Sequence, residues 1–248
     1  MLRVSVIRIW DEVSMGSSGK RVAMVSGASR GIGRMIAERL LCDGFRISAG
    51  VRDPDVAAQF EGDPAAYMVY PYDARDQNSA RTWVSATVER FGRVDVLVVN
   101  AGIFLEWEVD SPDDGPLDKM WETNVRGAAQ LVQASWNELK ESASGRVVTV
   151  SSMSGLRVKS ARSTGYAMTK FALTALTDGI RQSGWNHGIR ATAICPGYVA
   201  TDMGMMASDA GRQNMTQPET VAQLVSTIIS LPNEASVPLV PLTCELEP

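Results

Sequence analysis

The chain has 248 residues, of which 45% are hydrophobic and 21% charged, and its formal net charge is −4 at pH 7. This length fits one large α/β domain, and the average composition excludes a disordered, collagen-like or disulfide-stapled protein. The chain carries no basic surplus that would attract nucleic acid and no apolar run long enough to span a membrane. We therefore predict a cytoplasmic protein without a nucleic-acid or membrane partner.

The cysteines and the histidine form no pattern typical of a metal site. Cys42, Cys195 and Cys244 lie far apart in the sequence, and His187 is the single histidine. We predict neither a bound metal nor a disulfide framework. The usual pairing of a histidine with a serine or cysteine nucleophile is also missing unless His187 itself serves. We interpret His187 as a surface or capping residue beside Gly188.

The first 19 residues differ in character from the rest of the chain. They lack the long apolar core and the small-residue cleavage site of a signal peptide. The alternating Val4 and Val6 are compatible with a short strand, and Met15 is compatible with a later start of the native chain. We predict an N-terminal extension over residues 1–19, followed by one domain over residues 20–248.

From residue 20 onward, strand-like and helix-like stretches alternate, which is the pattern of a parallel sheet covered by helices on both faces. The predicted strands span residues 21–26, 46–50, 67–72, 94–100, 146–152, 189–195 and 237–243. The predicted helices span residues 32–42, 78–91, 117–141, 165–184 and 219–231. This order predicts a doubly wound α/β fold with a parallel sheet of about seven strands.

Residues 198–217 break the alternation. Four methionines, at positions 203, 205, 206 and 215, lie there among glycine, serine and aspartate residues. Flexible thioethers in a polar segment are typical of an adaptable lid over an apolar ligand. The alternative is a surface helix whose methionine stripe packs against the core. The sequence leaves both interpretations open.

A glycine-rich turn follows the first predicted strand and opens the first predicted helix. Glycines permit positive φ angles and close approach of a pyrophosphate, and a helix N-terminus offers unpaired N–H groups. This context predicts a dinucleotide site. The residues that we expect to bind the cofactor there are Gly27, Ser29, Arg30, Gly31, Ile32 and Gly33.

The end of the second predicted strand indicates which dinucleotide binds. An NAD site usually has an acidic residue there that accepts from the ribose 2′-hydroxyl. This chain has Val51 and Arg52 instead, and Arg30 could approach from the turn. Guanidinium groups favour a 2′-phosphate, so we predict NADP(H) over NAD(H). Asp53 leaves NAD open if the strand ends two residues later.

Tyr166 and Lys170 are spaced i and i+4 on a predicted helix, which puts both on one face. A neighbouring cation should lower the pKa of the tyrosine toward neutrality, as proton transfer requires. Ser151 and Ser152 close the fifth predicted strand, the stretch 100–102 closes the fourth, and the pair at 196–197 follows the sixth. All therefore lie at the carboxyl edge of the sheet, where ligands bind.

Together these motifs resemble the short-chain dehydrogenase/reductase family, with a likeness that runs from about Gly19 to Ser236. The chain is similar to the NADP-dependent carbonyl and 3-oxoacyl-carrier-protein reductases of that family. The resemblance implies a single-domain Rossmann fold. It also implies assembly into a homotetramer, with a homodimer as the second possibility.

The resemblance implies a role for each matching residue. Tyr166 is expected to transfer the proton, and Lys170 to hold the nicotinamide ribose and lower the tyrosine pKa. Ser152 is expected to bind the substrate oxygen, because Gly155 follows it in the family's Ser-x-x-Gly pattern, and Asn124 to position a water. The further cofactor-binding residues that the resemblance implies are Asp73, Ala74, Asn100, Ala101, Gly102, Pro196, Gly197, Val199 and Thr201.

We therefore expect an NADP(H)-dependent oxidoreductase that acts on a small-molecule ketone or secondary alcohol. One alternative is a 3-oxoacyl-carrier-protein reductase, whose acidic partner would meet the basic residues Arg157, Lys159 and Arg162. A more remote alternative is a cofactor-binding sensor without catalysis. The residues expected to shape an apolar substrate pocket are Phe104, Trp107, Tyr198, Met203 and Met206.

Overall fold

The computed structural model describes residues 20–55, 60–207 and 211–245, so the predicted extension over residues 1–19 lies outside the described residues. Within these ranges, seven parallel strands form one sheet in the order β3-β2-β1-β4-β5-β6-β7. The strands are β1 (Val22–Ser26), β2 (Arg46–Val51), β3 (Tyr67–Pro71), β4 (Val96–Val99), β5 (Arg146–Val150), β6 (Arg190–Pro196) and β7 (Leu239–Leu242).

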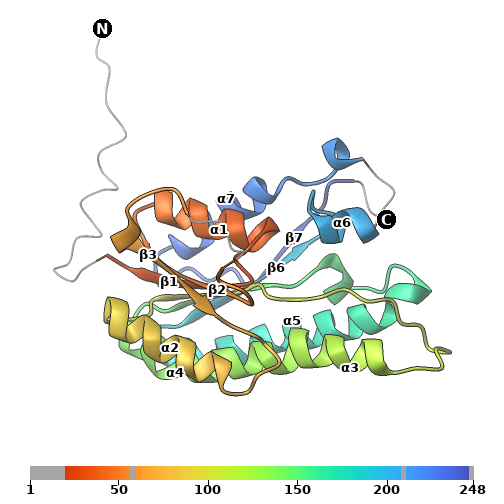
Figure 1. Cartoon of the computed structure of the whole chain (residues 1–248), viewed down its shortest axis with the longest axis horizontal. Coiled ribbons are helices and arrows are strands. Elements are labelled where there is room, and N and C mark those ends of the chain that lie inside the picture. Colours follow the sequence, from red (N-terminus) through yellow and green to blue (C-terminus); the bar gives the residue numbers. More distant parts are fainter. Residues whose placement is uncertain (1–19, 56–59, 208–210, 246–248) are drawn as a thin grey trace, which may run out of the picture.

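Helices cover both faces of this sheet (Figure 1). One face carries α1 (Gly31–Cys42) and α7 (Pro218–Ile229); the other carries α2 (Ser79–Phe91), α4 (Ala128–Glu141) and α5 (Thr164–Gly184). Each face has its own hydrophobic core, and β4 contributes Val96 and Val98 to one core and Leu97 and Val99 to the other. A strand buried on both faces reads as a continuous apolar run. The predicted doubly wound α/β fold is confirmed.

The helix predicted over residues 117–141 is interrupted. α3 (Gly115–Trp121) passes into a π-helical stretch (Glu122–Gly127), which continues into α4. A Cβ atom on Gly127 would overlap the carbonyl oxygen of Ala74, so glycine is needed for this stretch to pack on the loop after β3. Such π-helical stretches occur often at functional sites, and Asn124 lies within this one.

The carboxyl ends of the central strands face a common edge of the sheet. The strand order reverses at β1, which has β2 on one side and β4 on the other. Open α/β sheets bind ligands beyond such a switch point. The strand predicted over residues 146–152 ends two residues early, because Ser152 caps a 3₁₀ turn (Met153–Gly155). Its serine hydroxyl therefore lies at this edge and not in the sheet.

The segment 198–217 leaves the sheet after β6 and returns to it. A parallel bridge between Val199 and Thr216 joins its two ends, and α6 (Asp202–Ala207) lies between them. Met203, Met205 and Met206 are exposed, whereas Met215 is buried. The interpretation as a methionine stripe packed on the core is therefore wrong for three of the four residues.

Two further sequence expectations concern surface features. His187 ends an exposed 3₁₀ turn (Trp185–His187) before Gly188, whose φ is +76°, as expected for a residue beside a helix cap. In the part of the chain that the structure describes, no helix combines the length and the apolar character needed to cross a membrane.

The packing of Gly50 generates a test of the sheet–helix contact. A Cβ atom on Gly50 would lie 2.5–2.8 Å from the ring of Trp83, which is fully buried and donates to Ser48 Oγ at 2.8 Å. We predict that Gly50→Ala lowers stability by about 1–3 kcal/mol through overpacking, seen as a lower midpoint in thermal unfolding.

Gly179→Ala is the matched control. Gly179 lies within α5, and no atom lies within 4 Å of the Cβ position. Alanine there should raise stability by about 0.5–1 kcal/mol, because it restricts the unfolded chain and favours helix. Equal unfolding midpoints for the two variants would contradict the packing argument.

Candidate active site

The glycine-rich turn is held to the end of β4 by side chains on both sides. Ser26 Oγ accepts from the backbone N–H groups of Asn100 (2.9 Å) and Ala101 (3.0 Å). In return, Asn100 Nδ2 donates to the carbonyl oxygens of Ser26 (2.9 Å) and Gly27 (3.2 Å). A Cβ atom on Gly33 would overlap this amide nitrogen. Asn100, expected to support the adenosine side of the cofactor, thus has a bracing contact with the turn.

The turn has the shape that a phosphate group requires. Gly27 and Gly31 adopt φ angles of +67° and +58°, which side chains with a Cβ rarely allow. No side chain caps the N-terminus of α1, where Arg30 is the N-cap residue with an extended backbone. The first N–H groups of α1 are therefore not satisfied by a side-chain cap, and this is the usual arrangement for binding a pyrophosphate.

The end of β2, where an NAD site usually has an acidic residue, carries one buried and one exposed residue. Val51 belongs to the core and is 2% exposed, while Arg52 is exposed. Asp73 forms an ion pair with Arg75, Nη2 to Oδ2 at 3.1 Å. The pKa of Asp73 is lowered chiefly by its hydrogen bond from Arg75, with Arg52 also contributing. Sequence reasoning missed Arg75, although an aspartate often accepts from the backbone N–H two residues on, as Asp73 Oδ1 does from Arg75 N at 2.9 Å.

Tyr166, Lys170 and Ser152 come together beside this edge. The Ser152 hydroxyl is near enough to that of Tyr166 to lower the pKa of the tyrosine as a hydrogen-bond partner. Lys170 is buried, donates from Nζ to the Val150 carbonyl at 2.9 Å and lies 5.6 Å from the centre of the Tyr166 ring. Ser151 is engaged elsewhere, since its Oγ contacts the Lys170 carbonyl at 3.1 Å. Of the two serines, Ser152 is therefore the one that meets the tyrosine.

The electrostatics of this cluster differ from the expectation. Burial raises the pKa of Tyr166 to about 12, and the Ser152 hydrogen bond only partly opposes it. Burial likewise lowers the pKa of Lys170 to about 8, against the opposing effect of Cys195. The lowering of the tyrosine pKa that we expected from Lys170 does not appear in this structure, where loss of hydration dominates. Tyr166 is therefore protonated at neutral pH.

Asn124 braces the loop after β4. Its Oδ1 accepts from Ile103 N at 2.8 Å, and its Nδ2 donates to Ile103 O at 2.9 Å and Thr169 Oγ1 at 3.0 Å. Both amide donors are used, and the residue is fully buried. The side chain thus ties the π-helical stretch to the loop and to α5. Its water-positioning role stays a prediction.

The residues expected around the substrate lie in two places. The ring of Phe104 stands edge-on to Tyr166, with centroids 5.2 Å apart, and Trp107 pairs through its backbone with Arg162 and Gly165, next to the tyrosine. Tyr198 instead lies under Lys159, whose Nζ is 4.0 Å from the ring centre. Met203 and Met206 are exposed on α6.

Tyr198 also borders an open hollow of about 790 Å³, which lies between residues 213–217 and residues 242–245. Its walls are residues 213–217, Thr220 and residues 242–245. Lys159 closes one side through an ion pair with Glu245 at 2.9 Å. No contact links this hollow to Tyr166, so Tyr198 is not brought together with the tyrosine cluster by any contact among the described residues.

Further predicted cofactor residues lie at the end of β6 and in the segment after it. Gly197, directly after Pro196, donates its backbone N–H to Leu242 O at 2.7 Å. Val199 forms the bridge to Thr216, and the methyl group of Thr201 would lie 3.2 Å from a Cβ on Gly31. The segment after β6 therefore leans over the glycine-rich turn. Among the described residues, no group of three His, Cys, Asp or Glu side chains could hold a metal ion.

The comparisons with known proteins agree with this geometry. A family model described as short chain dehydrogenase matches residues 21–211. Agropine synthesis reductase of Rhizobium rhizogenes is 39% identical over 232 residues, which are 91% of this chain and 53% of that protein. The chain therefore spans about half the length of this relative.

Two further proteins are similar over most of their length. Acetoacetyl-CoA reductase of Shinella zoogloeoides is 30% identical over 183 residues, 74% of this chain and 76% of that protein. The crystal structure of a short chain dehydrogenase from Burkholderia cenocepacia J2315 in complex with NADP has a TM-score of 0.80 at 28% identity, covering 92% of this chain and 97% of that chain. The chain belongs to the short chain dehydrogenase family.

The contacts of Asn124 lead to a test that separates a structural role of this side chain from a role in catalysis. Asn124→Ala leaves the part-buried N–H and C=O groups of Ile103 without their partner, and an unpaired group costs about 1–3 kcal/mol where water cannot reach it. We predict that this variant loses about 2–4 kcal/mol of stability in thermal or urea unfolding.

The exposed Asn186 supplies the control, since Asn186→Ala should unfold at the midpoint of the parent. An Asn124→Ala variant with the stability of the parent but without activity would show that the side chain acts in the chemistry alone.

Proposed function

We propose that the chain is an NADP(H)-dependent oxidoreductase that transfers a hydride between nicotinamide and a ketone or secondary alcohol. The observation that carries the proposal is the half-buried Tyr166, whose hydroxyl has Ser152 as its neighbour and whose ring lies 5.6 Å from Lys170 Nζ, at the sheet edge that bears the glycine-rich turn. The uncapped N-terminus of α1 and the overlap that a Cβ on Gly33 would cause fit a pyrophosphate there.

In the reductive direction, Tyr166 donates its proton to the carbonyl oxygen of the substrate. Its raised pKa keeps the hydroxyl protonated at neutral pH, which suits a general acid. Ser152 holds the same oxygen, and Lys170, with a pKa of about 8, is still charged at neutral pH and can hold the ribose hydroxyls. A bound nicotinamide cofactor supplies the hydride. In the oxidative direction, Tyr166 must accept a proton, and alkaline pH favours this step.

The substrate that we propose is a small carbonyl compound or alcohol. Phe104 and Trp107 border Tyr166 and offer it an apolar wall. The relatives named as reductases of agropine synthesis and of acetoacetyl-CoA support carbonyl reduction. The acetoacetyl-CoA reductase also supports the alternative of a 3-oxoacyl thioester substrate. However, the basic residues that would attract an acidic carrier protein are already paired, Lys159 with Glu245 and Arg162 with Glu106. Such pairs give little net charge to attract an acidic carrier protein, so we favour a small molecule.

We also propose assembly into a homotetramer, with a homodimer as the second possibility. Met168 and Phe171 of α5 are exposed, at 44% and 43%, and Trp121 of α3 is 40% exposed. Helices α3 and α5 lie on the same face of the sheet (Figure 1). Apolar side chains gathered on helices are typical of interfaces between identical copies.

The proton-transfer role of Tyr166 leads to a direct kinetic test. Tyr166→Phe removes the hydroxyl and keeps the ring, so it should abolish turnover of a generic ketone while the Kd for NADPH changes by less than about threefold. Ser152→Ala should lower kcat by about 10²–10³-fold, the scale for one preorganised donor. Retention of more than a few per cent of kcat by Tyr166→Phe would remove the tyrosine from the mechanism.

The exposed Arg52 leads to a test of cofactor choice. We predict that kcat/KM favours NADPH over NADH. Arg52→Ala should lower kcat/KM for NADPH by about tenfold, because it removes one charge-assisted contact whose strength is reduced by solvent exposure. The value for NADH should stay unchanged. Equal losses for both cofactors would assign Arg52 to structure or surface. A carboxylate at position 51, which would favour NADH by accepting from the ribose 2′-hydroxyl, is not a suitable test, because Val51 is buried in the core.

A further inference from the structure

Helix α6 is fixed closely against the segment that precedes it. Thr201 Oγ1 accepts from Gly204 N at 3.2 Å, and Met205 N donates to Thr201 O at 2.9 Å. A Cβ atom on Gly204 would overlap the Val199 carbonyl oxygen, so the first turn of α6 lies directly on this segment. The first residue of α6 is Asp202. Its position relative to the glycine-rich turn is therefore set by the backbone.

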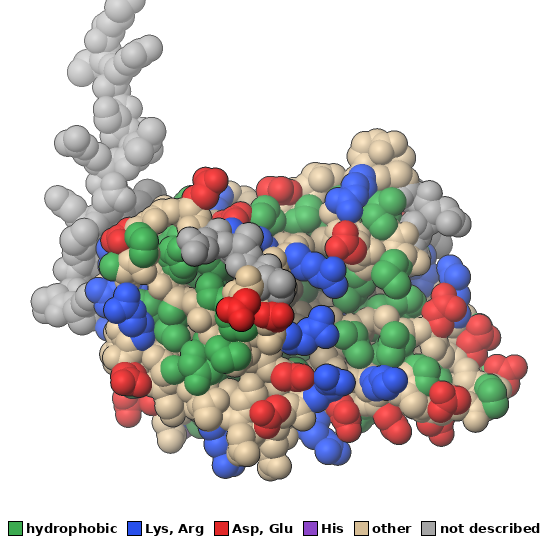
Figure 2. All heavy atoms as spheres, in the orientation of Figure 1, with side chains coloured by type: hydrophobic (Ala, Val, Ile, Leu, Met, Phe, Trp, Pro, Cys, Tyr) green, Lys and Arg blue, Asp and Glu red, His purple; other side chains and the backbone are tan. Residues whose placement is uncertain are grey.

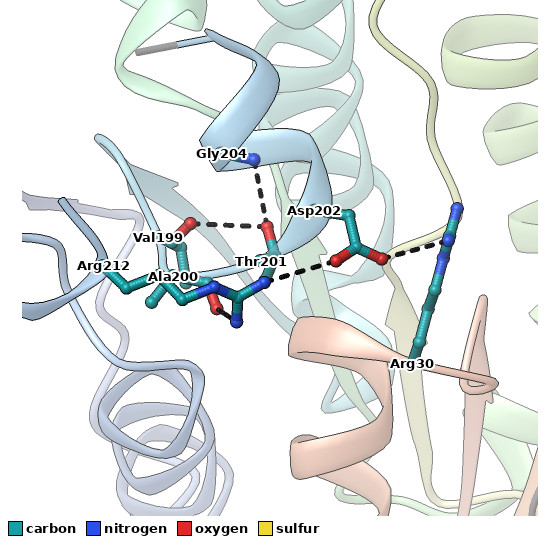
Figure 3. Close-up of polar contacts among 7 residues, drawn as sticks. All are labelled: Arg30, Val199, Ala200, Thr201, Asp202, Gly204 and Arg212. Atoms are coloured by element: carbon teal, nitrogen blue, oxygen red, sulfur yellow. Dashed lines mark hydrogen bonds and ion pairs between the residues drawn. The ribbon is translucent and has the colours of Figure 1, made fainter. Parts of the chain in front are cut away.

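Asp202 joins two arginines from separate parts of the chain (Figure 3). Its Oδ2 pairs with Arg30 Nη1 at 3.1 Å, and its Oδ1 pairs with Arg212 Nη2 at 3.4 Å. Arg212 also donates from Nη1 to the Ala200 carbonyl at 3.3 Å. The carboxylate thus connects the N-cap of α1 to the segment after β6, across the turn that we propose to bind the cofactor.

Arg30 is one of two arginines proposed to meet the 2′-phosphate, and in this arrangement one of its terminal nitrogens is already used by Asp202. A phosphate monoester carries nearly two negative charges at neutral pH and accepts stronger hydrogen bonds than a carboxylate. The side chains of Arg30 and Asp202 are 74% and 63% exposed, so their ion pair is weak enough to exchange. Arg212 would keep the carboxylate paired after Arg30 leaves.

We propose that Asp202 is a specificity-determining residue that competes with the 2′-phosphate of NADP(H) for Arg30. The inference rests on the proposed use of NADP(H). Binding of NADP(H) requires exchange of the Arg30 partner from Asp202 to the phosphate. Binding of NAD(H), which lacks the phosphate, leaves the Arg30–Asp202 pair intact. Asp202 therefore reduces the preference for NADP(H) that the two arginines create.

The test measures Kd values for NADPH and NADH by calorimetry in the parent and in Asp202→Asn. Removing the competing carboxylate should tighten NADPH about two- to fivefold, the range that an exposed ion pair supports, and change NADH by less than about 1.5-fold. Asp178→Asn is the matched control: Asp178 is 64% exposed and pairs with Arg181 at 3.0 Å on α5. This control should leave both Kd values unchanged.

Repeating the substitution in an Arg30→Ala background shows whether Arg30 mediates the effect. The double variant Arg30→Ala/Asp202→Asn should bind NADPH as Arg30→Ala does, because the competition no longer exists. The same gain in both backgrounds would mean that Asp202 acts through its general charge, and it would overturn the proposal. Weaker or unchanged NADPH binding by Asp202→Asn would also overturn it.

Binding of 2′-AMP and 5′-AMP separates this proposal from the proposed cofactor. A parent protein that binds 2′-AMP no better than 5′-AMP has no 2′-phosphate site, and the NADP(H) proposal fails together with this one. If the parent prefers 2′-AMP while Asp202→Asn leaves that preference unchanged, the cofactor proposal stands and the competition is absent.

Discussion

The mutual hydrogen bonds of Ser26 and Asn100 are the constraint on which the rest of the site depends. They join the end of β1 to the end of β4, the two strands between which the sheet order reverses. Because the amide of Asn100 occupies the space beside Gly33, the turn must follow one path into α1. That path leaves the N-terminus of α1 without a side-chain cap and directs it at the ligand edge.

The same edge explains the electrostatics of the tyrosine cluster. Lys170 projects from α5, and its ammonium donates to the carbonyl of Val150, the last residue of β5. Burial then shifts both groups toward their neutral forms, raising the pKa of Tyr166 and lowering that of Lys170. A low-polarity site strengthens every later interaction with a developing oxyanion. The cluster therefore favours proton donation at neutral pH over proton removal.

Much of this could be predicted from the sequence, because the signals were local. The strands, their parallel order and the glycine-rich turn follow from apolar runs and glycine positions, and the i, i+4 spacing identified Tyr166 with Lys170. Features that depend on tertiary contacts could not be predicted. The side chain of Asn124 is saturated by Ile103 and Thr169, and the burial of Val51 excludes it from the ligand.

Charge pairing across distant segments was the second kind of information that the sequence lacked. Figure 2 shows basic and acidic side chains intermingled over one face of the molecule. Two ion pairs join residues far apart in the sequence, Arg162 with Glu106 and Lys159 with Glu245, and no spacing rule would indicate them. A third pair, Arg75 with Asp73, is local. Basic residues that looked available for an acidic partner are therefore mostly neutralised by their neighbours.

These pairs determine where attraction for a phosphate remains. In the part of the chain that the structure describes, Arg52 forms no ion pair and stays exposed at the end of β2, while Arg30 is held by Asp202. Arg52 can therefore meet a 2′-phosphate without breaking a salt bridge, whereas Arg30 must first exchange its partner. Breaking an exposed ion pair costs little free energy. The net contribution of Arg30 to phosphate binding is therefore its contact with the phosphate minus the lost ion pair with Asp202. On this proposal, the preference between NADP(H) and NAD(H) depends on a residue in the segment after β6, far in sequence from the glycine-rich turn.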